Sequence, residues 1–116
     1  MEEFKRGDIV TLKFPFAEKA SKTKLRPALI IQNDIGNRYS KNTIVLMITS
    51  LSSSSKLYPV QVLIPENSGA GLKKTSIVDA GVVFSVSKDR IKNKIGECPT
   101  KIMKEVNTAI KVSLDI

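Results

Sequence analysis

Hydrophobic residues occur along this chain in short runs separated by polar, turn-forming residues, a pattern typical of a mainly β protein. Four of these runs have the length of a strand: residues 8–14, 27–32, 43–49 and 59–65. The second is almost continuously apolar, so we expect it to be buried on both faces of a sheet. Residues 75–86 predict one or two more strands around Gly81.

The segments between these runs are predicted to be turns and loops. They are a lysine-rich loop at residues 17–24, a turn at 33–37, a serine-rich loop at 50–56 and a glycine-containing loop at 67–71. We therefore expect strands joined by short connections, as in an all-β barrel or sandwich.

The period of the pattern changes after Pro99, where apolar residues recur at three- and four-residue spacing. This spacing predicts a C-terminal helix, with Thr100 as its N-cap. Its apolar stripe indicates a packing surface, directed at the sheet or at a second subunit, and consists of Ile102, Met103, Val106, Ala109, Ile110 and Leu114.

Length and composition predict a single domain spanning residues 1–116, with 41% apolar residues to form its core. The aliphatic runs are far shorter than the roughly 18 residues of a membrane span. The N-terminus is charged and lacks the apolar run of a signal peptide. The one cysteine, Cys98, has no partner for an internal disulfide. We expect a cytoplasmic protein that does not associate with a membrane.

The charge points to a polyanionic partner. Nineteen Lys and Arg against eleven Asp and Glu give a net charge of +8. A field of this sign attracts RNA, the main polyanion of the cytoplasm. The same excess of lysine also serves solubility alone, so both interpretations remain open at this point.

The absence of histidine excludes several kinds of active site. A histidine-based acid–base ribonuclease mechanism and a Ser-His-Asp triad are both impossible. With one cysteine and no histidine, no metal site and no other cofactor is expected. An enzyme with this composition must use Arg, Lys, Thr, Ser, Tyr and scattered carboxylates.

Two strand ends carry residues suited to binding phosphate. Arg26 precedes Pro27, which favours extended backbone there, and a guanidinium binds phosphate bidentately. Thr49 and Ser50 end the third predicted strand, where a hydroxyl either bonds a phosphate oxygen or starts the turn. Taken alone, each of these residues is equally compatible with an ordinary surface.

A third basic feature consists of alternate cations at Lys88, Arg90, Lys92 and Lys94. In an extended segment these four side chains share one face. Such a stripe either contacts phosphate or forms a solvated edge that prevents aggregation.

In order and spacing, several segments resemble the MazF/PemK toxin family. They are residues 5–10, 25–38, 44–49, 58–62 and 87–96, of which the run Arg-Pro-Ala-Leu-Ile-Ile-Gln-Asn-Asp at 26–34 is the most specific. The resemblance implies an SH3-like β-barrel with a C-terminal α-helix, of the MazF/PemK/CcdB type, assembled as a homodimer.

The resemblance also implies a function. Members are toxins of type II toxin–antitoxin pairs that cleave single-stranded RNA at specific sequences and so inhibit translation and growth. They need no metal and leave a 2′,3′-cyclic phosphate and a 5′-hydroxyl. A small acidic antitoxin of the MazE/PemI type covers the active groove.

By position, Arg26 matches the family's catalytic arginine and Thr49 its catalytic threonine. Arg26 would stabilise charge on the phosphate and could also transfer a proton to the leaving 5′-oxygen, and Thr49 would orient the phosphate. The residues expected to bind RNA are Lys13, Lys22, Lys24, Ser50, Ser52 and Lys56.

This chain departs from the family pattern in the loop at 17–24, which lines the RNA groove in relatives. Better-known members carry a glutamate there, and Ser21 stands in its place. Glu18 or Asp34 could substitute for the missing carboxylate, and the general base stays unassigned. Two alternatives remain: a barrel that binds RNA or an antitoxin without cleavage, and a gyrase-poisoning toxin of the same fold. The pair Arg26 and Thr49 argues against the second.

Overall fold

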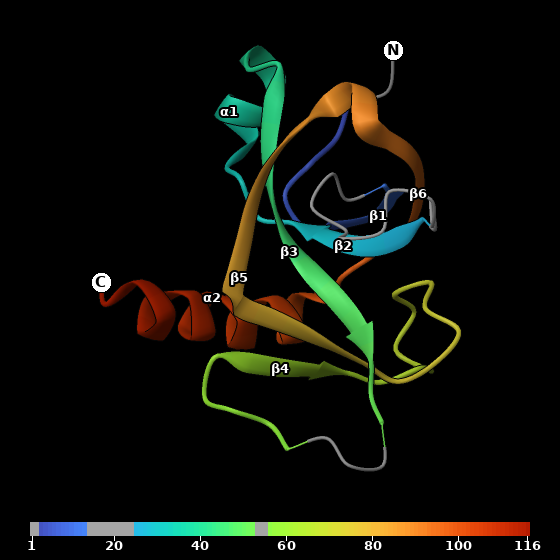
Figure 1. Cartoon of the computed structure of the whole chain (residues 1–116), viewed down its shortest axis with the longest axis vertical. Coiled ribbons are helices and arrows are strands. Elements are labelled where there is room, and N and C mark those ends of the chain that lie inside the picture. Colours follow the sequence, from blue (N-terminus) through green and yellow to red (C-terminus); the bar gives the residue numbers. More distant parts are fainter. Residues whose placement is uncertain (1–2, 14–24, 53–55) are drawn as a thin grey trace.

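The computed structural model describes residues 3–13, 25–52 and 56–116, and its strands form one antiparallel sheet (Figure 1). The strand order across this six-stranded sheet is β4-β5-β3-β2-β1-β6. The elements in chain order are β1 (Asp8–Leu12), β2 (Arg26–Ile30), α1 (Asp34–Tyr39), β3 (Asn42–Ser50), β4 (Gln61–Ile64), β5 (Ser76–Ser87), the 3-10 turn η1 (Lys88–Arg90), β6 (Ile91–Glu97) and α2 (Thr100–Leu114).

The sheet curves strongly, and each of its faces covers a hydrophobic cluster (Figure 1). Along β3, Val45 and Met47 face the cluster enclosed by the curved sheet, whereas Leu46 and Ile48 face the cluster shared with α2. The edge strands β4 and β6 do not pair with each other in the described part of the chain, so the barrel is open. The predicted mainly β fold with a C-terminal helix is confirmed.

The second strand is buried on both faces, as its apolar sequence predicts. Ala28, Leu29 and Ile30 have no exposed surface. Leu29 packs in the cluster under α2, and its two neighbours pack inside the barrel. The strand ends at Ile30 because the next two amides both donate to the carbonyl of Ile44, which takes the chain out of the regular ladder.

The turn predicted at residues 33–37 is wrong, because the short helix α1 begins there. The side chain of Asn33 accepts a hydrogen bond from the Gly36 N–H at 2.7 Å, which caps the helix. Asn37 is buried, and its side-chain oxygen Oδ1 accepts from the Thr43 hydroxyl at 2.6 Å. Capping and a buried side-chain bond thus turn a glycine-containing turn sequence into a helix.

The predicted C-terminal helix is confirmed as α2, and most of its apolar stripe faces the sheet. Ile102, Val106 and Ala109 are buried in the cluster beneath β3, β4 and β5. Thr100 is not the N-cap, since Pro99 occupies that position without a side-chain hydrogen bond. Leu114 is 54% exposed, so the packed stripe ends before it. No helix in the described ranges is long and apolar enough to span a bilayer.

The segment at residues 75–86 forms one long strand, β5, rather than two. Its register against β3 shifts between the pairs Ile48↔Val78 and Leu46↔Val83, and the strand bends there (Figure 1). Through this bend β5 pairs with β4 at its start and continues along β3 to its end.

The basic stripe predicted at alternate positions from Lys88 to Lys94 is wrong. Lys88 and Arg90 belong to η1, so the four cations do not share one strand. The Ser87 hydroxyl caps η1 by accepting from the Asp89 N–H. Lys94 lies on β6, and its ammonium pairs with Asp8 at 3.2 Å and with Glu97 at 3.3 Å.

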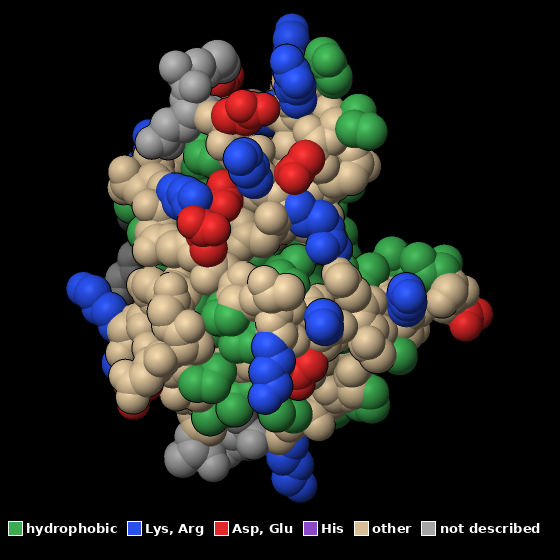
Figure 2. Space-filling model, turned by 180° about the vertical axis from the view of Figure 1, so that it is seen from behind, with side chains coloured by type: hydrophobic (Ala, Val, Ile, Leu, Met, Phe, Trp, Pro, Cys, Tyr) green, Lys and Arg blue, Asp and Glu red, His purple; other side chains and the backbone are tan. Residues whose placement is uncertain are grey.

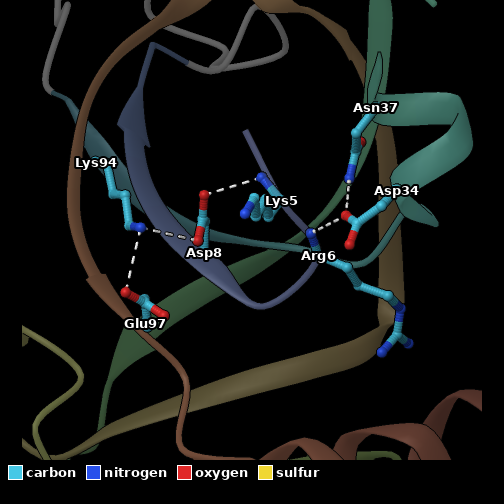
Figure 3. A network of polar contacts seen from close by, with 7 residues as sticks. All are labelled: Lys5, Arg6, Asp8, Asp34, Asn37, Lys94 and Glu97. Atoms are coloured by element: carbon cyan, nitrogen blue, oxygen red, sulfur yellow. Dashed lines mark hydrogen bonds and ion pairs between the residues drawn. The ribbon is translucent and has the colours of Figure 1, made fainter. Parts of the chain in front are cut away.

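A polar network attaches the N-terminal segment to the rest of the molecule (Figure 3). The Lys5 N–H donates to Asp8 at 2.9 Å, and the Arg6 N–H donates to Asp34 at 2.7 Å. The Arg6 guanidinium bonds the carbonyl of Ile31 and the side chain of Asn107 on α2. The bond from the Arg6 N–H lowers the pKa of Asp34, so this carboxyl is charged at neutral pH.

Candidate functional site

The two residues proposed for catalysis lie on neighbouring strands at the same end of the sheet. Arg26 is the first residue of β2, and Thr49 is the penultimate residue of β3; both are exposed. The ladder between β2 and β3 ends at the pair Ala28↔Met47, and the same register continued by two residues sets Arg26 opposite Thr49. Cross-strand neighbours have Cβ atoms about 4.5–5.5 Å apart, so one phosphate can reach both side chains.

Arg26 and Thr49 belong to a row of side chains that crosses five strands. Leu12 on β1 is paired with Arg26, and Ile77 on β5 is paired with Thr49. Leu63 on β4 is paired with Ile77 and completes the row. Because paired residues point to the same face of a sheet, the row presents a cation and a hydroxyl flanked by apolar side chains.

The barrel supports this row from below. Ala28 and Met47 lie one step inward from Arg26 and Thr49 on the same face, and both pack in the enclosed cluster. Pro27, which lies between Arg26 and Ala28 on β2, restricts the backbone there to the extended form. The backbone that carries Arg26 and Thr49 is therefore supported by a packed core, as suits a site that must hold a reacting group.

The other predicted RNA-binding residues are distributed around this end of the sheet. Lys13 directly follows Leu12 of the row and is exposed. Ser50 is paired with Ser76 and so lies on the opposite face from Thr49. Ser52 and Lys56 are exposed beyond the end of β3. The remaining predicted residues of this region lie outside the described ranges: Lys22, Lys24, Glu18 and Ser21.

Asp34, proposed as a substitute carboxylate, lies away from the row. It is the first residue of α1, beyond the end of β2 opposite to Arg26. Its Oδ1 accepts from the Arg6 N–H and from the Asn37 amide. The structure thus gives Asp34 a role in attaching the N-terminal segment.

A polar pair next to the row was missed by sequence reasoning. Asp79 follows Ile77 by two residues on β5 and is paired with Gln61 of β4, so both lie on the face of Thr49. The Gln61 Nε2 donates to Asp79 Oδ2 at 3.1 Å. The signal in the sequence was an aspartate within an otherwise apolar strand, where a carboxylate costs stability unless it is hydrogen-bonded.

The chemistry of the row suits an anionic substrate. A guanidinium offers bidentate hydrogen bonds and a permanent positive charge, and the hydroxyl beside it can donate to an oxygen of the same group. Across the described ranges, no three or more Asp, Glu or Cys side chains gather as metal ligands would.

Comparison with known proteins agrees with this geometry. The family model for the PemK-like, MazF-like toxin of type II toxin–antitoxin systems matches residues 5–114. Endoribonuclease MazF of Staphylococcus saprophyticus is 37% identical over 112 residues, which cover 97% of this chain and 92% of that protein. Endoribonuclease EndoA of Bacillus subtilis is 33% identical over 110 residues, covering 95% and 93%.

Solved structures share the fold as well. An endoribonuclease from a mycobacterial species, in complex with its cognate antitoxin, superimposes with a TM-score of 0.81 at 22% identity, and the match covers 97% of this chain and 96% of that one. The resemblance seen in the sequence is thereby confirmed over almost its whole length. The chain belongs to the family of PemK-like, MazF-like toxins of type II toxin–antitoxin systems.

Proposed function

We propose that this protein is the toxin of a type II toxin–antitoxin pair and cleaves single-stranded RNA at specific sequences without a metal ion. The observation that supports the proposal most directly is the register of β2 and β3, which ends at Ala28↔Met47 and, continued by two residues, brings Arg26 opposite Thr49. The relatives named as endoribonucleases, at 33–37% identity, support the same activity. The net charge of +8 favours association with RNA.

In this mechanism the ribose 2′-hydroxyl attacks the adjacent phosphorus, and the bond from phosphorus to the 5′-oxygen breaks. The 2′-hydroxyl gives up its proton, and the leaving 5′-oxygen takes one up. The products carry a 2′,3′-cyclic phosphate and a 5′-hydroxyl. Because the nucleophile is the 2′-hydroxyl, DNA is not a substrate.

Arg26 and Thr49 act on the phosphate in this step. The negative charge that develops on the non-bridging oxygens lies against the Arg26 guanidinium, which stabilises it. The Thr49 hydroxyl donates to one of these oxygens and fixes the orientation of the phosphate. Arg26 thus acts in this step through its positive charge and its hydrogen bonds to the phosphate.

The residues around this end of the sheet extend the contact with RNA. Lys13 and Lys56 are exposed cations that can bind neighbouring phosphates, and Ser52 lies between the end of β3 and Lys56. Lys22 and Lys24 would add two more cations, whereas Ser50 faces the other side of the sheet and is not part of this contact.

The positive surface also determines the partner. We expect an acidic antitoxin of the MazE/PemI type to cover the row and to block access of RNA, as its charge is complementary. A toxin of this kind acts in the cytoplasm, where its RNA substrate and its antitoxin are made.

A second copy of the chain is the proposed partner of the end of α2. There Val112, Leu114 and Ile116 are 54%, 54% and 80% exposed, and Figure 2 shows hydrophobic side chains on this projecting helix. Beside them is a hollow of about 310 Å³ lined by Arg6, Asn107, Ile110, Lys111 and Ile116. Exposed apolar surface of this kind is typical of a subunit interface. A homodimer would bury it.

Induction of the protein in bacteria without an antitoxin tests the proposed function. We expect growth arrest and loss of full-length messenger RNA, and we expect the Arg26→Ala variant, at equal expression, to be harmless. Normal growth with intact RNA would contradict the proposal. RNA binding without any cleavage would establish the alternative, a barrel that binds RNA but does not cut it.

A further inference from the structure

The polar pair Gln61–Asp79 is held in one arrangement by bonds from the backbone. The Tyr58 N–H donates to Gln61 Oε1 at 3.1 Å, which directs the Nε2 group towards Asp79. On the other side the Gly81 N–H donates to Asp79 Oδ1 at 2.7 Å. Both side chains are half-buried, and a chain of three hydrogen bonds therefore fixes the carboxylate.

This carboxylate lies on the strand next to Thr49. Thr49 is paired with Ile77, and Asp79 follows Ile77 by two residues on the face that the pairing of β5 with β4 defines. Asp79 itself lies where the register of β5 against β3 shifts, directly after the pair Ile48↔Val78. Leu63 lies beside the pair and is 36% exposed, so it offers an apolar side chain against which a base can pack.

A negative charge at this place repels phosphate, so the part of RNA that can approach it is a base. A carboxylate only accepts hydrogen bonds, and each of its oxygens can accept more than one. The groups of a base that donate strongly are ring N–H groups and exocyclic amines. Gln61 Nε2 keeps a second N–H, which can donate to the ring nitrogen or carbonyl next to such an amine.

We propose that Asp79, positioned by Gln61, recognises the exocyclic amine of a base beside the cleaved bond and so contributes to the sequence specificity of the enzyme. This inference rests on the proposed endoribonuclease activity. Asp79 on β5 is separated from Arg26 on β2 by the strand β3, so we assign it to a base and not to the 2′-hydroxyl. It acts on the choice of substrate and not on the chemical step.

The test compares RNA oligonucleotides in which single nucleotides near the cleavage site lack their exocyclic amine, such as inosine for guanosine, purine riboside for adenosine and uridine for cytidine. For the wild-type protein, one of these replacements should lower kcat/KM by about tenfold or more, because it leaves the held carboxylate without its donor. In the Asp79→Asn variant the same replacement should leave kcat/KM almost unchanged.

The Asp79→Asn change keeps one of the two bonds that hold this side chain, since its amide oxygen still accepts from the Gly81 N–H. Its amide nitrogen replaces Oδ2, which accepts from Gln61 Nε2, so the bond between the strands is lost together with the acceptor that faces the base. The double variant Gln61→Glu/Asp79→Asn keeps the hydrogen bond between the strands with its direction reversed, so it answers the question if the single variant is unstable. Glu105→Gln, which neutralises an exposed carboxylate on α2, is the matched control and should keep the wild-type discrimination.

The outcomes separate the two proposals. Discrimination lost in Asp79→Asn or in the double variant, with cleavage kept, supports the inference. Unchanged discrimination, or an equal loss of kcat/KM on every oligonucleotide, overturns it and gives Asp79 a structural or chemical role. A wild-type protein that cuts none of the oligonucleotides, nor any longer RNA, refutes the proposed function itself.

Discussion

Removal of Arg26 and Thr49, singly and together, tests whether one phosphate bridges the two side chains. The register of β2 and β3, continued by two residues beyond Ala28↔Met47, brings them opposite each other, and cross-strand neighbours have Cβ atoms about 4.5–5.5 Å apart. Residues that contact the same group do not contribute independently, and their interaction energy is typically about 0.5–3 kcal/mol. The structure therefore predicts that the two substitutions are not additive.

The magnitudes follow from the chemistry of each group. Arg26→Ala removes the charge that stabilises the phosphate in the transition state and should lower kcat by about 10²- to 10³-fold. Thr49→Ala removes one neutral hydrogen bond, worth about 1 kcal/mol or somewhat more, and should lower kcat about five- to tenfold. In the double variant kcat should fall only slightly below that of Arg26→Ala. Without the Arg26 guanidinium to bind the phosphate, the orienting hydrogen bond from Thr49 contributes little.

The assay is cleavage of a fluorogenic RNA oligonucleotide in EDTA, with circular dichroism to show that each variant is folded. Arg38 gives the control pair, since it is an exposed arginine on α1, beyond the far end of β2. Arg38→Ala and Thr49→Ala should be additive within about 0.5 kcal/mol. Additivity of Arg26→Ala and Thr49→Ala, or full activity of either single variant, would refute the shared site.

Three further predictions concern the framework of the site. Val106→Ala, in the cluster beneath α2, should lower the free energy of unfolding measured in urea by about 2–3 kcal/mol, because two methyl groups are lost and a cavity is left. The exposed Val112→Ala should change this free energy by less than about 0.5 kcal/mol. Equal effects of the two variants would refute the packing of α2. Burial raises the pKa of the Cys98 thiol to about 11, so maleimide should react with it much more slowly at pH 8 in the native protein than in urea, and similar rates would show an accessible thiol. The hydrogen bond from the Arg6 N–H lowers the pKa of Asp34 in the folded protein. The Asp34 carboxylate therefore stabilises the fold above the ordinary carboxyl pKa, and this stabilisation is lost as the pH falls through the lowered value. Asp34→Asn should accordingly lower Tm at pH 7 and have no effect in strong acid; a difference that is constant with pH would contradict this role.

Most of the strands could be predicted because the pattern of neighbouring apolar and polar residues determines them. The uninterrupted apolar run at residues 27–32 corresponds to β2, and the three- and four-residue spacing after Pro99 corresponds to α2. In both cases burial of the apolar side chains determines the element, and the period of the pattern shows which face is buried.

The errors arise where a contact distant in sequence decides the structure. Helix α1 has the composition of a turn, and its buried Asn37 is stabilised by a bond from Thr43 on β3, which the local pattern does not show. The basic stripe from Lys88 to Lys94 failed for a related reason, since η1 interrupts the extended backbone that the alternation assumes.

The candidate site shows the same division. Arg26 and Thr49 could be selected from the sequence by family resemblance, but their juxtaposition follows only from the register of β2 and β3. The pair Gln61–Asp79 could not be found from the sequence, because its meaning depends on the pairing of β4 with β5 and on the face that the two strands share with Thr49.

Cleavage of a chimeric oligonucleotide in EDTA tests the central claim, metal-independent cleavage through the 2′-hydroxyl, most directly. The substrate is an RNA that the protein cuts once, prepared also with a single 2′-deoxy nucleotide on the 5′ side of the cleaved bond, and the products are weighed by mass spectrometry. The account predicts a 2′,3′-cyclic phosphate and a 5′-hydroxyl from the all-ribose substrate, and an uncut 2′-deoxy substrate. A requirement for magnesium, or cleavage at the 2′-deoxy position, would contradict it.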